Sequence, residues 1–306
     1  MTAAPSTLAL WSPSLADAPR SLDDWIDRVD AKLARCADEG ADLLIMPELT
    51  AMAWLGYGPK MALTEHCAWL ADRAAVAIPR LRARAVERGV SLVPGSTPYR
   101  HERDGRLVNR AFFLAADGAV HHHDKLALTP TESQPDAWCL EGGDALRVFH
   151  WRGLRVAMLI CLDAQLTRAA ARLSAHRVDL LIVPAGTREL AGHHRVFDCA
   201  KARAIELQCP VAAVGLLGPI GKERYVGGTA VYLPCEPSLD HTGVLHQSGP
   251  IAPDTADDPF VVVRDVPFAH CRTIRRGDAQ AYSIPARWLD SAVRDSIRSM
   301  MPVIGR

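Results

Sequence analysis

The chain has 306 residues, with 35 Lys+Arg against 35 Asp+Glu, so its formal net charge at pH 7 is +0. This balance removes the broad electrostatic drive for binding nucleic acid or an anionic membrane surface, and a hydrophobic share of 49% argues against disorder. No apolar run approaches the roughly 18 residues of a membrane helix, residues 1–11 lack the basic region of a secretory signal, and the eight cysteines include no C-x-x-C pair. The sequence therefore predicts a soluble, cytoplasmic protein with reduced thiols.

The first half of the chain alternates apolar runs with amphipathic segments. A helix is expected from Ser21, followed by an acidic residue three positions later, to a stop at Gly40. A second helical zone at 64–88 contains Pro79, where we expect an interruption. The predicted strands of this half are 7–11, 42–46 and 90–94, with a hairpin of 109–115 and 119–124 turned at Asp117-Gly118.

The second half repeats the same alternation. We predict strands at 146–151, 154–160, 178–183, 210–216, 229–233 and 261–266, and helices at 167–175, about 194–208, and 285–299. Repeated β-α-β units favour one layered α/β domain over residues 1–270. Residues 271–306 are expected to be a C-terminal extension that packs on the domain or on a neighbouring subunit.

Three polar or nucleophilic residues directly follow predicted strands, where the working residues of such sheets gather. Cys161 ends an apolar strand before a helix, so its thiol is a candidate nucleophile activated by nearby backbone N–H groups; the alternative is a cysteine that simply packs. Glu48 is a candidate general base, or else a surface acid or helix cap. Lys125 is a candidate for oxyanion stabilisation, or else a solvated loop lysine.

Histidines are the other chemically suggestive feature. His121, His122 and His123 place alternate imidazoles on one strand face, but no third ligand has a fixed spacing, so we predict a polar strand face and no metal. The pair His193 and His194 follows a strand end, and we likewise predict that it binds no metal. A Cys-His protease or transferase stays open at this point, because twelve histidines leave many possible partners.

Taken together, these segments resemble the nitrilase superfamily of carbon–nitrogen hydrolases, in its amidase-like branch, over about residues 6–265. MPELT resembles the glutamate motif of the family, HHHDKLALTPTE its lysine motif and LRVAMLICLDAQ its cysteine motif. The later segments AKARAIELQCPVAAVG and GGTAVYLP resemble two further family blocks. The resemblance implies an α/β fold, a four-layer αββα sandwich, that uses no cofactor and assembles into homodimers or larger homo-oligomers. An apolar stripe near the C-terminus fits such assembly and comprises Ile284, Trp288, Val293, Ile297 and Met301.

The resemblance also implies roles for individual residues. Cys161 would be the nucleophile, Glu48 the general base and Lys125 the oxyanion stabiliser, while Glu132 would orient substrate and lysine. The backbone N–H of Leu162 would complete the oxyanion hole. The implied reaction is hydrolysis of a small linear amide to a carboxylic acid and ammonia through a thioester.

Several alternatives stay open. Cys-Leu-Asp is closer to the amidase-like branches than to the Cys-Trp-Glu of true nitrilases, yet a nitrilase or an N-carbamoyl-amide hydrolase would use the same residues, and an inactive scaffold would keep the same fold. The substrate itself is not predicted. Five loop residues are candidates for lining the pocket, although each is equally consistent with a packed or solvated position: Trp54, Tyr57, Trp138, Arg188 and His194.

Overall fold

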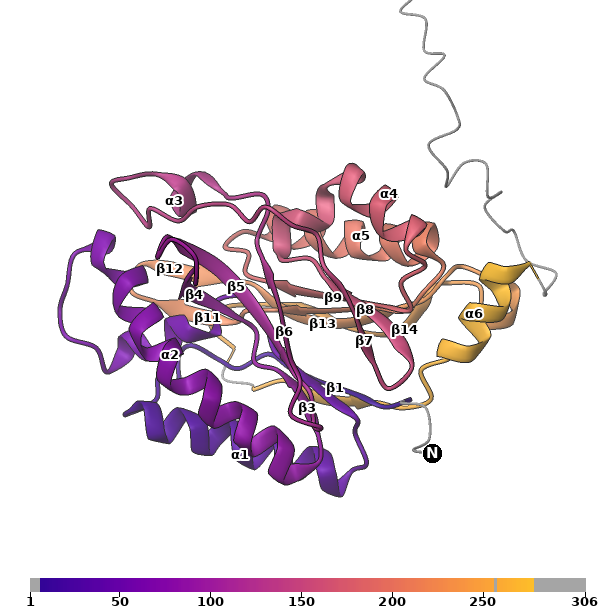
Figure 1. Ribbon diagram of the computed structural model, residues 1–306, viewed down its shortest axis with the longest axis horizontal. Coiled ribbons are helices and arrows are strands. Elements are labelled where there is room, and N and C mark those ends of the chain that lie inside the picture. The colour runs from indigo at the N-terminus through magenta and orange to yellow at the C-terminus, as the bar shows by residue number, and fades with distance from the viewer. Residues whose placement is uncertain (1–5, 256–257, 278–306) are drawn as a thin grey trace, which may run out of the picture.

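The computed structural model describes residues 6–255 and 258–277 of the chain. Two β-sheets are stacked face to face, with α1 and α2 covering the outer side of one sheet and α4 and α5 covering the outer side of the other (Figure 1). This four-layer αββα sandwich confirms the predicted fold class. Each sheet buries one face against the other sheet and one face against helices.

The first sheet combines parallel and antiparallel strands. Strands β1, β2 and β3 are parallel to one another, while β15, β5, β4 and β6 join antiparallel. The hairpin of β5 and β6 is the predicted one, whereas β4 was not predicted from the sequence. The seven strands are β15 (Phe260–Val263), β1 (Leu8–Trp11), β2 (Leu43–Ile45), β3 (Ser91–Val93), β5 (Leu107–Leu114) and β4 (Ser96–Arg100) in spatial order, with β6 (Val120–Asp124) paired to β5.

The second sheet has a parallel centre formed by β8, β9 and β10, with antiparallel strands on both sides. A separate two-stranded hairpin comprises β11 (Gly218–Ile220) and β12 (Glu223–Tyr225). The six strands of the sheet are, in spatial order, β14 (Val244–Ile251), β13 (Gly227–Tyr232), β10 (Val211–Gly215), β9 (Leu180–Ala185), β8 (Leu154–Met158) and β7 (Val148–Trp151).

The helices begin and end largely where the sequence places them. Ser21 caps the first helix, because its Oγ accepts a hydrogen bond from the backbone N–H of Asp24 at 3.1 Å. The helices are α1 (Leu22–Asp38), α2 (Leu63–Arg88), α3 (Pro130–Ser133), α4 (Thr167–Ala175), α5 (Leu190–Leu207) and α6 (Phe268–Arg276), with 3₁₀ helices η1 (Thr50–Gly56), η2 (Cys161–Gln165) and η3 (Pro237–Leu239).

Two helix predictions need correction. Helix α2 runs unbroken through Pro79, because this residue lies on the exposed side, where water can bind the carbonyl that the proline leaves without a donor. Helix α5 begins at Leu190 rather than near His194, and its N-cap residue Glu189 makes no side-chain capping bond. The start of α5 therefore carries none of the capping signals by which a helix N-terminus is read from sequence.

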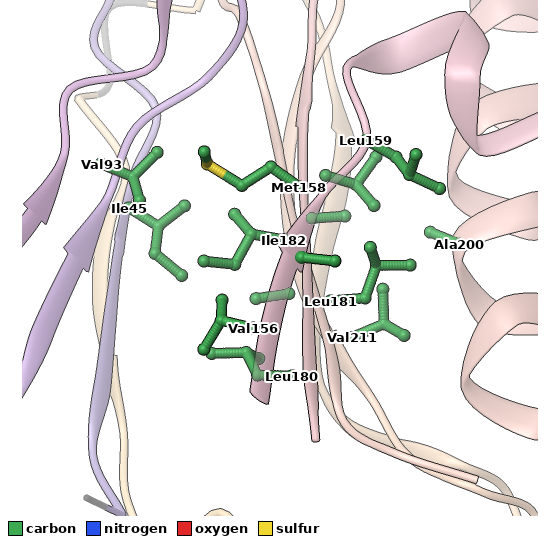
Figure 2. Packing of buried hydrophobic residues seen from close by; sticks show 14 of the residues in the cluster. Ile45, Val93, Val156, Met158, Leu159, Leu180, Leu181, Ile182, Ala200 and Val211 are labelled. Atoms are coloured by element: carbon green, nitrogen blue, oxygen red, sulfur yellow. The ribbon is translucent and has the colours of Figure 1, made fainter. Parts of the chain in front are cut away.

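The main core lies between the two sheets (Figure 2). Met158 and Ile182 of the second sheet point toward Ile45 and Val93 of the first, whereas their neighbours Leu159 and Leu181 point the other way, toward α5. Successive side chains of a strand face opposite sides of its sheet, so β8 and β9 are buried on both faces. This double burial explains why these strands read as continuous apolar runs.

Helix α6 crosses residue 270, the predicted boundary between domain and extension. Arg272 forms an ion pair with the buried Asp179 at 2.7 Å, and Arg275 contacts the same carboxylate, so α6 is attached to the turn before β9. The predicted helix 285–299 and its apolar stripe lie outside the described residues. Among the helices of residues 6–255 and 258–277, none has both the length and the apolar character needed to cross a lipid bilayer.

Candidate active site

The structure brings the three strand-end candidates together. Glu48 follows β2, Lys125 follows β6 and Cys161 follows β8, so the site draws on both sheets where they meet. Gly186, which follows β9, joins them. Polar groups gather at such strand ends because the strand interiors are occupied by the core.

Lys125 lies between two carboxylates. Its Nζ donates to Glu48 Oε1 at 2.7 Å and to Glu132 Oε2 at 2.7 Å, and all three residues are at most 2% exposed. Asn109, on β5, ties the same two acids together, because its Nδ2 donates to Glu48 Oε1 and to Glu132 Oε1, each at 3.0 Å. The ammonium group is therefore held by directed hydrogen bonds as well as by charge.

Glu132 is fixed independently by the start of α3. Its Oε2 accepts hydrogen bonds from the backbone N–H of Thr129 at 2.9 Å and from the Thr129 hydroxyl at 2.8 Å, which is a capping-box arrangement. The same carboxylate thus caps a helix and binds Lys125. Glu132 is predicted to orient the lysine, and the hydrogen bonds from Lys125 Nζ to its carboxylate are the contact that this role needs.

Cys161 sits at a strained turn between β8 and η2. Its backbone φ is 49°, in the left-handed region that residues other than glycine rarely adopt. Such backbone strain persists only where the surrounding structure enforces it. The Glu48 carboxylate and the backbone N–H of Gly186 both lie close enough to the thiol to influence its protonation: Glu48 raises the pKa of Cys161 and the N–H of Gly186 lowers it. A Cβ at position 186 would lie 3.1 Å from Glu48 Oε2, so a glycine there leaves the carboxylate its space.

Asp163 connects the Cys161 turn to the Lys125 segment. Its carboxylate is fully buried and accepts backbone hydrogen bonds from Leu126 at 3.0 Å and Ala127 at 2.8 Å. It also accepts from the N–H of Ile160 at 3.2 Å and lies 3.1 Å from Nε2 of His123. One buried carboxylate therefore joins the backbone before Cys161 to the backbone that follows Lys125.

The enclosed setting shifts the protonation of all three groups. Burial raises the pKa of Glu48 to about 7, with Lys125 opposing the shift and Glu132 adding to it. Burial acts to lower the pKa of Lys125, but the carboxylates of Glu48 and Glu132 outweigh it and raise that pKa above its usual range. Burial also raises the pKa of the Cys161 thiol, and Glu48 adds to that rise. The resting site thus holds a neutral thiol, a protonated lysine and a carboxylate able to take a proton near pH 7.

A cavity of about 600 Å³ leads to this group, and Glu48, Lys125 and Glu132 line its closed end. Of the five predicted pocket residues, Trp138 and Arg188 line the cavity. Trp54, Tyr57 and His194 do not. Neither the buried Cys161 nor the half-buried Leu162 is itself among the lining residues, although Glu48, Lys125 and Gly186 beside them are.

Helical periodicity explains these placements. A 3₁₀ helix repeats every three residues, so Met52 and Leu55 share the cavity side of η1, whereas Trp54 and Tyr57 share another side. Trp54 is buried in the core beneath α2, and Tyr57 packs on Trp69 at a ring-centroid distance of 5.7 Å. His194 lies on the exposed face of α5 rather than in a loop.

The histidine-rich strand serves the structure in another way. His121 stacks on Phe149 with ring centroids 4.3 Å apart, and His123 contacts Asp163. Among the residues that the structure describes, no group of three or more His, Cys, Asp or Glu side chains is arranged to hold a metal ion.

Comparison with known proteins identifies the family of this chain. The carbon–nitrogen hydrolase family model matches residues 13–235, so the chain belongs to the carbon–nitrogen hydrolase family, and its fold is that of the amidases of the nitrilase superfamily. The amidase of Nesterenkonia sp. AN1 is 25% identical, with a TM-score of 0.66 over 89% of this chain and 97% of that chain. A variant of that amidase, 24% identical with a TM-score of 0.66 over 90% of this chain and 95% of that chain, carries the acetamide moiety of fluoroacetamide on its active-site cysteine.

Two curated relatives are longer than the matched region. The probable hydrolase YhcX of Bacillus subtilis is 22% identical over 84% of this chain, which spans 49% of that protein. The (R)-stereoselective amidase of a Pseudomonas species is 26% identical over 57% of this chain and 59% of its own length. The chain thus spans about half the length of the curated relatives it matches.

Proposed function

We propose that this protein hydrolyses a small linear amide to a carboxylic acid and ammonia, with Cys161 as the nucleophile. One observation carries the proposal: a lysine ammonium is held between two buried carboxylates beside a buried thiol, and the charges of the lysine and of both carboxylates act on that thiol. Each group that acyl transfer needs is therefore present in one enclosed site.

In the first half of the reaction, the Cys161 sulfur attacks the amide carbon while Glu48 takes the thiol proton. The developing oxyanion accepts hydrogen bonds from Lys125 Nζ and from the backbone N–H of Leu162. Glu48 then returns its proton to the departing nitrogen, so ammonia leaves and a thioester remains on Cys161. The raised pKa of Glu48 suits this shuttle, since a group with a pKa near 7 both accepts and releases a proton readily.

In the second half, water hydrolyses the thioester. Glu48 takes a proton from the water as the water oxygen attacks the acyl carbon, and the leaving Cys161 thiolate then receives that proton from Glu48, which restores the resting site. Glu132 acts as a positioning residue, because it holds Lys125 in place and favours its protonated form. Lys125 thus remains a hydrogen-bond donor throughout the cycle rather than a base.

The test is ammonia release across a panel of short amides, nitriles and N-carbamoyl compounds, with Cys161→Ala as the variant and Cys199→Ala as its control. Cys199 lies on α5 outside the cavity, so its replacement removes a thiol without touching the site. We expect the wild type and Cys199→Ala to release ammonia from amides and Cys161→Ala to release none. Activity of Cys161→Ala comparable with wild type would refute the proposal, and a wild type inactive on the whole panel would favour a scaffold role.

A further inference from the structure

The outer part of the cavity carries positive charge that the proposed reaction does not use. Of the five lysines in the chain, three line this cavity: Lys60, Lys125 and Lys222. Arginine supplies all the rest of the 35 basic residues, and elsewhere in this protein the lysines are Lys32 and Lys201 alone. Lysine presents a compact, mobile ammonium that suits an anionic group on a small ligand.

Lys60 and Lys222 approach the cavity from different segments. Lys60 lies in the segment between η1 and α2. Lys222 lies in the turn between β11 and β12, and β11 packs against η1. Figure 1 shows this hairpin at the same end of the sandwich as α3, which carries Glu132. Both lysines are exposed, and within the described part of the chain neither ammonium group forms a hydrogen bond or an ion pair.

The other titratable groups in the outer cavity leave this positive charge uncompensated. Arg188 forms an ion pair with Glu223 at 2.9 Å, so these two charges offset one another. Burial lowers the pKa of His66, which keeps its imidazole neutral at pH 7. Two free positive charges therefore remain, in a protein whose formal net charge is +0.

The charge changes sign along the cavity. At the closed end, the two carboxylates of Glu48 and Glu132 outnumber the single ammonium of Lys125. An anionic group on a substrate would therefore be repelled there. The wall also includes the apolar side chains of Leu55 on η1 and Ile220 on β11, two elements that pack against each other. The cavity volume of about 600 Å³ is far larger than a bare amide group requires.

We propose that the substrate is an amide whose acyl chain ends in a carboxylate, with the amide at Cys161, the chain along the apolar wall and the carboxylate beside Lys60 and Lys222. This inference rests on the proposed function. It assigns Lys60 and Lys222 to substrate selection and leaves the bond-breaking steps unchanged.

Matched pairs of amides test the inference. Adipamate and hexanamide share a six-carbon chain and one amide and differ only in a terminal carboxylate, as do glutaramate and pentanamide, and succinamate and butanamide. We expect the wild type to have a kcat/KM about tenfold higher for the anionic member of at least one pair, since each solvated charge contact contributes only a few-fold. The preference should shrink at high salt.

The double variant Lys60→Gln/Lys222→Gln should lose this preference through a higher KM for the anionic amide, with kcat and the neutral amide almost unaffected. Lys201→Gln removes the same charge from α5, away from the cavity, and should behave as wild type. If the neutral member of every pair is hydrolysed as well as the anionic one, or if the double variant keeps the preference, the inference is wrong, although the proposed function stands.

A binding measurement keeps the two proposals distinguishable when turnover is absent. If no amide is hydrolysed, the proposed function fails, and charge selection is then read from protection of Cys161 against iodoacetamide. We expect adipamate to protect at about tenfold lower concentration than hexanamide, and the double variant to abolish the difference. Equal protection by both compounds overturns the inference.

Discussion

Asp163 accepts a hydrogen bond from the backbone N–H of Ala127 at 2.8 Å, which fastens the segment after Lys125 to the turn that carries Cys161. The two segments come from different sheets, so no local interaction fixes their separation. A carboxylate with no exposed surface makes this connection, and its hydrogen bonds to the N–H groups replace the water it has lost. Asp163 is therefore a positioning residue whose effect on the reaction is measurable.

Replacement Asp163→Asn should lower kcat about 10²-fold, since an amide nitrogen would face N–H donors and move the thiol relative to the ammonium. The free energy of unfolding should fall by about 1–3 kcal/mol as well. The rate of alkylation at Cys161, measured by mass spectrometry, separates the two effects, because a purely structural role would leave it unchanged. Asp27→Asn on the exposed face of α1 is the control.

Lys125→Ala should reduce kcat/KM by at least 10²–10³-fold, which is the usual cost of about 3–4 kcal/mol for losing an oxyanion donor. The loss should exceed that figure, because the buried carboxylates of Glu48 and Glu132 would then lose the positive charge that compensates them. Lys125→Arg should not restore activity, since a planar guanidinium does not fit a side-chain position that is 1% exposed. Near-normal kcat in Lys125→Arg would show that the ammonium does not contact the reacting oxygen.

The pH dependence should follow Glu48. Its pKa is raised to about 7, and the protonated carboxyl cannot accept the thiol proton, so kcat/KM should fall as the pH drops through about 7. The ionised form predominates above that value, and activity should level off there. Because the pKa of Cys161 is also raised, iodoacetamide labelling of this thiol should follow the same profile in the wild type. A profile flat from pH 5 to 8 would contradict the assignment of Glu48 as base.

We expect the chain to form a homodimer or a larger homo-oligomer, as its resemblance to the nitrilase superfamily implies. The apolar stripe within 284–301 is the proposed contributor, so a chain ending at Gly277 should associate less strongly than the full chain. Sedimentation velocity at micromolar concentration measures the oligomeric state of the full chain and of the shortened chain. A full-length species of 33.3 kDa alone would contradict the expectation.

The sequence predicted the parts of the site that follow strands. Glu48, Lys125 and Cys161 each follow a strand marked by its residue pattern, and strand ends are where such residues gather. Asn109 and Gly186 were missed, because the first lies within a strand and the second is an ordinary glycine in sequence. Their importance comes from residues far away in sequence, Glu48 and Glu132 for Asn109 and Glu48 for Gly186, which no local pattern records.

The lining of the cavity was the least predictable part. Met52 and Leu55 face the cavity, whereas Trp54 packs into the core. The three-residue repeat of the 3₁₀ helix η1 determines which side chains face the cavity, and the sequence does not reveal that geometry. Lys60 and Lys222 lie far apart in sequence and share a cavity only because β11 packs against η1. No local pattern in the sequence marks Lys60 or Lys222 as part of a cavity.

The most direct test of the account is to trap the acyl-enzyme. Glu48→Gln keeps the shape of the side chain but cannot accept a proton, so acylation should be slow and hydrolysis of the thioester slower still. After mixing with an amide that the wild type hydrolyses, intact-mass and peptide measurements should find the acyl group on the Cys161 peptide, and none in Glu48→Gln/Cys161→Ala. Finding the acyl group on an exposed cysteine such as Cys139 or Cys235, or an unmodified protein that still releases ammonia, would contradict the account.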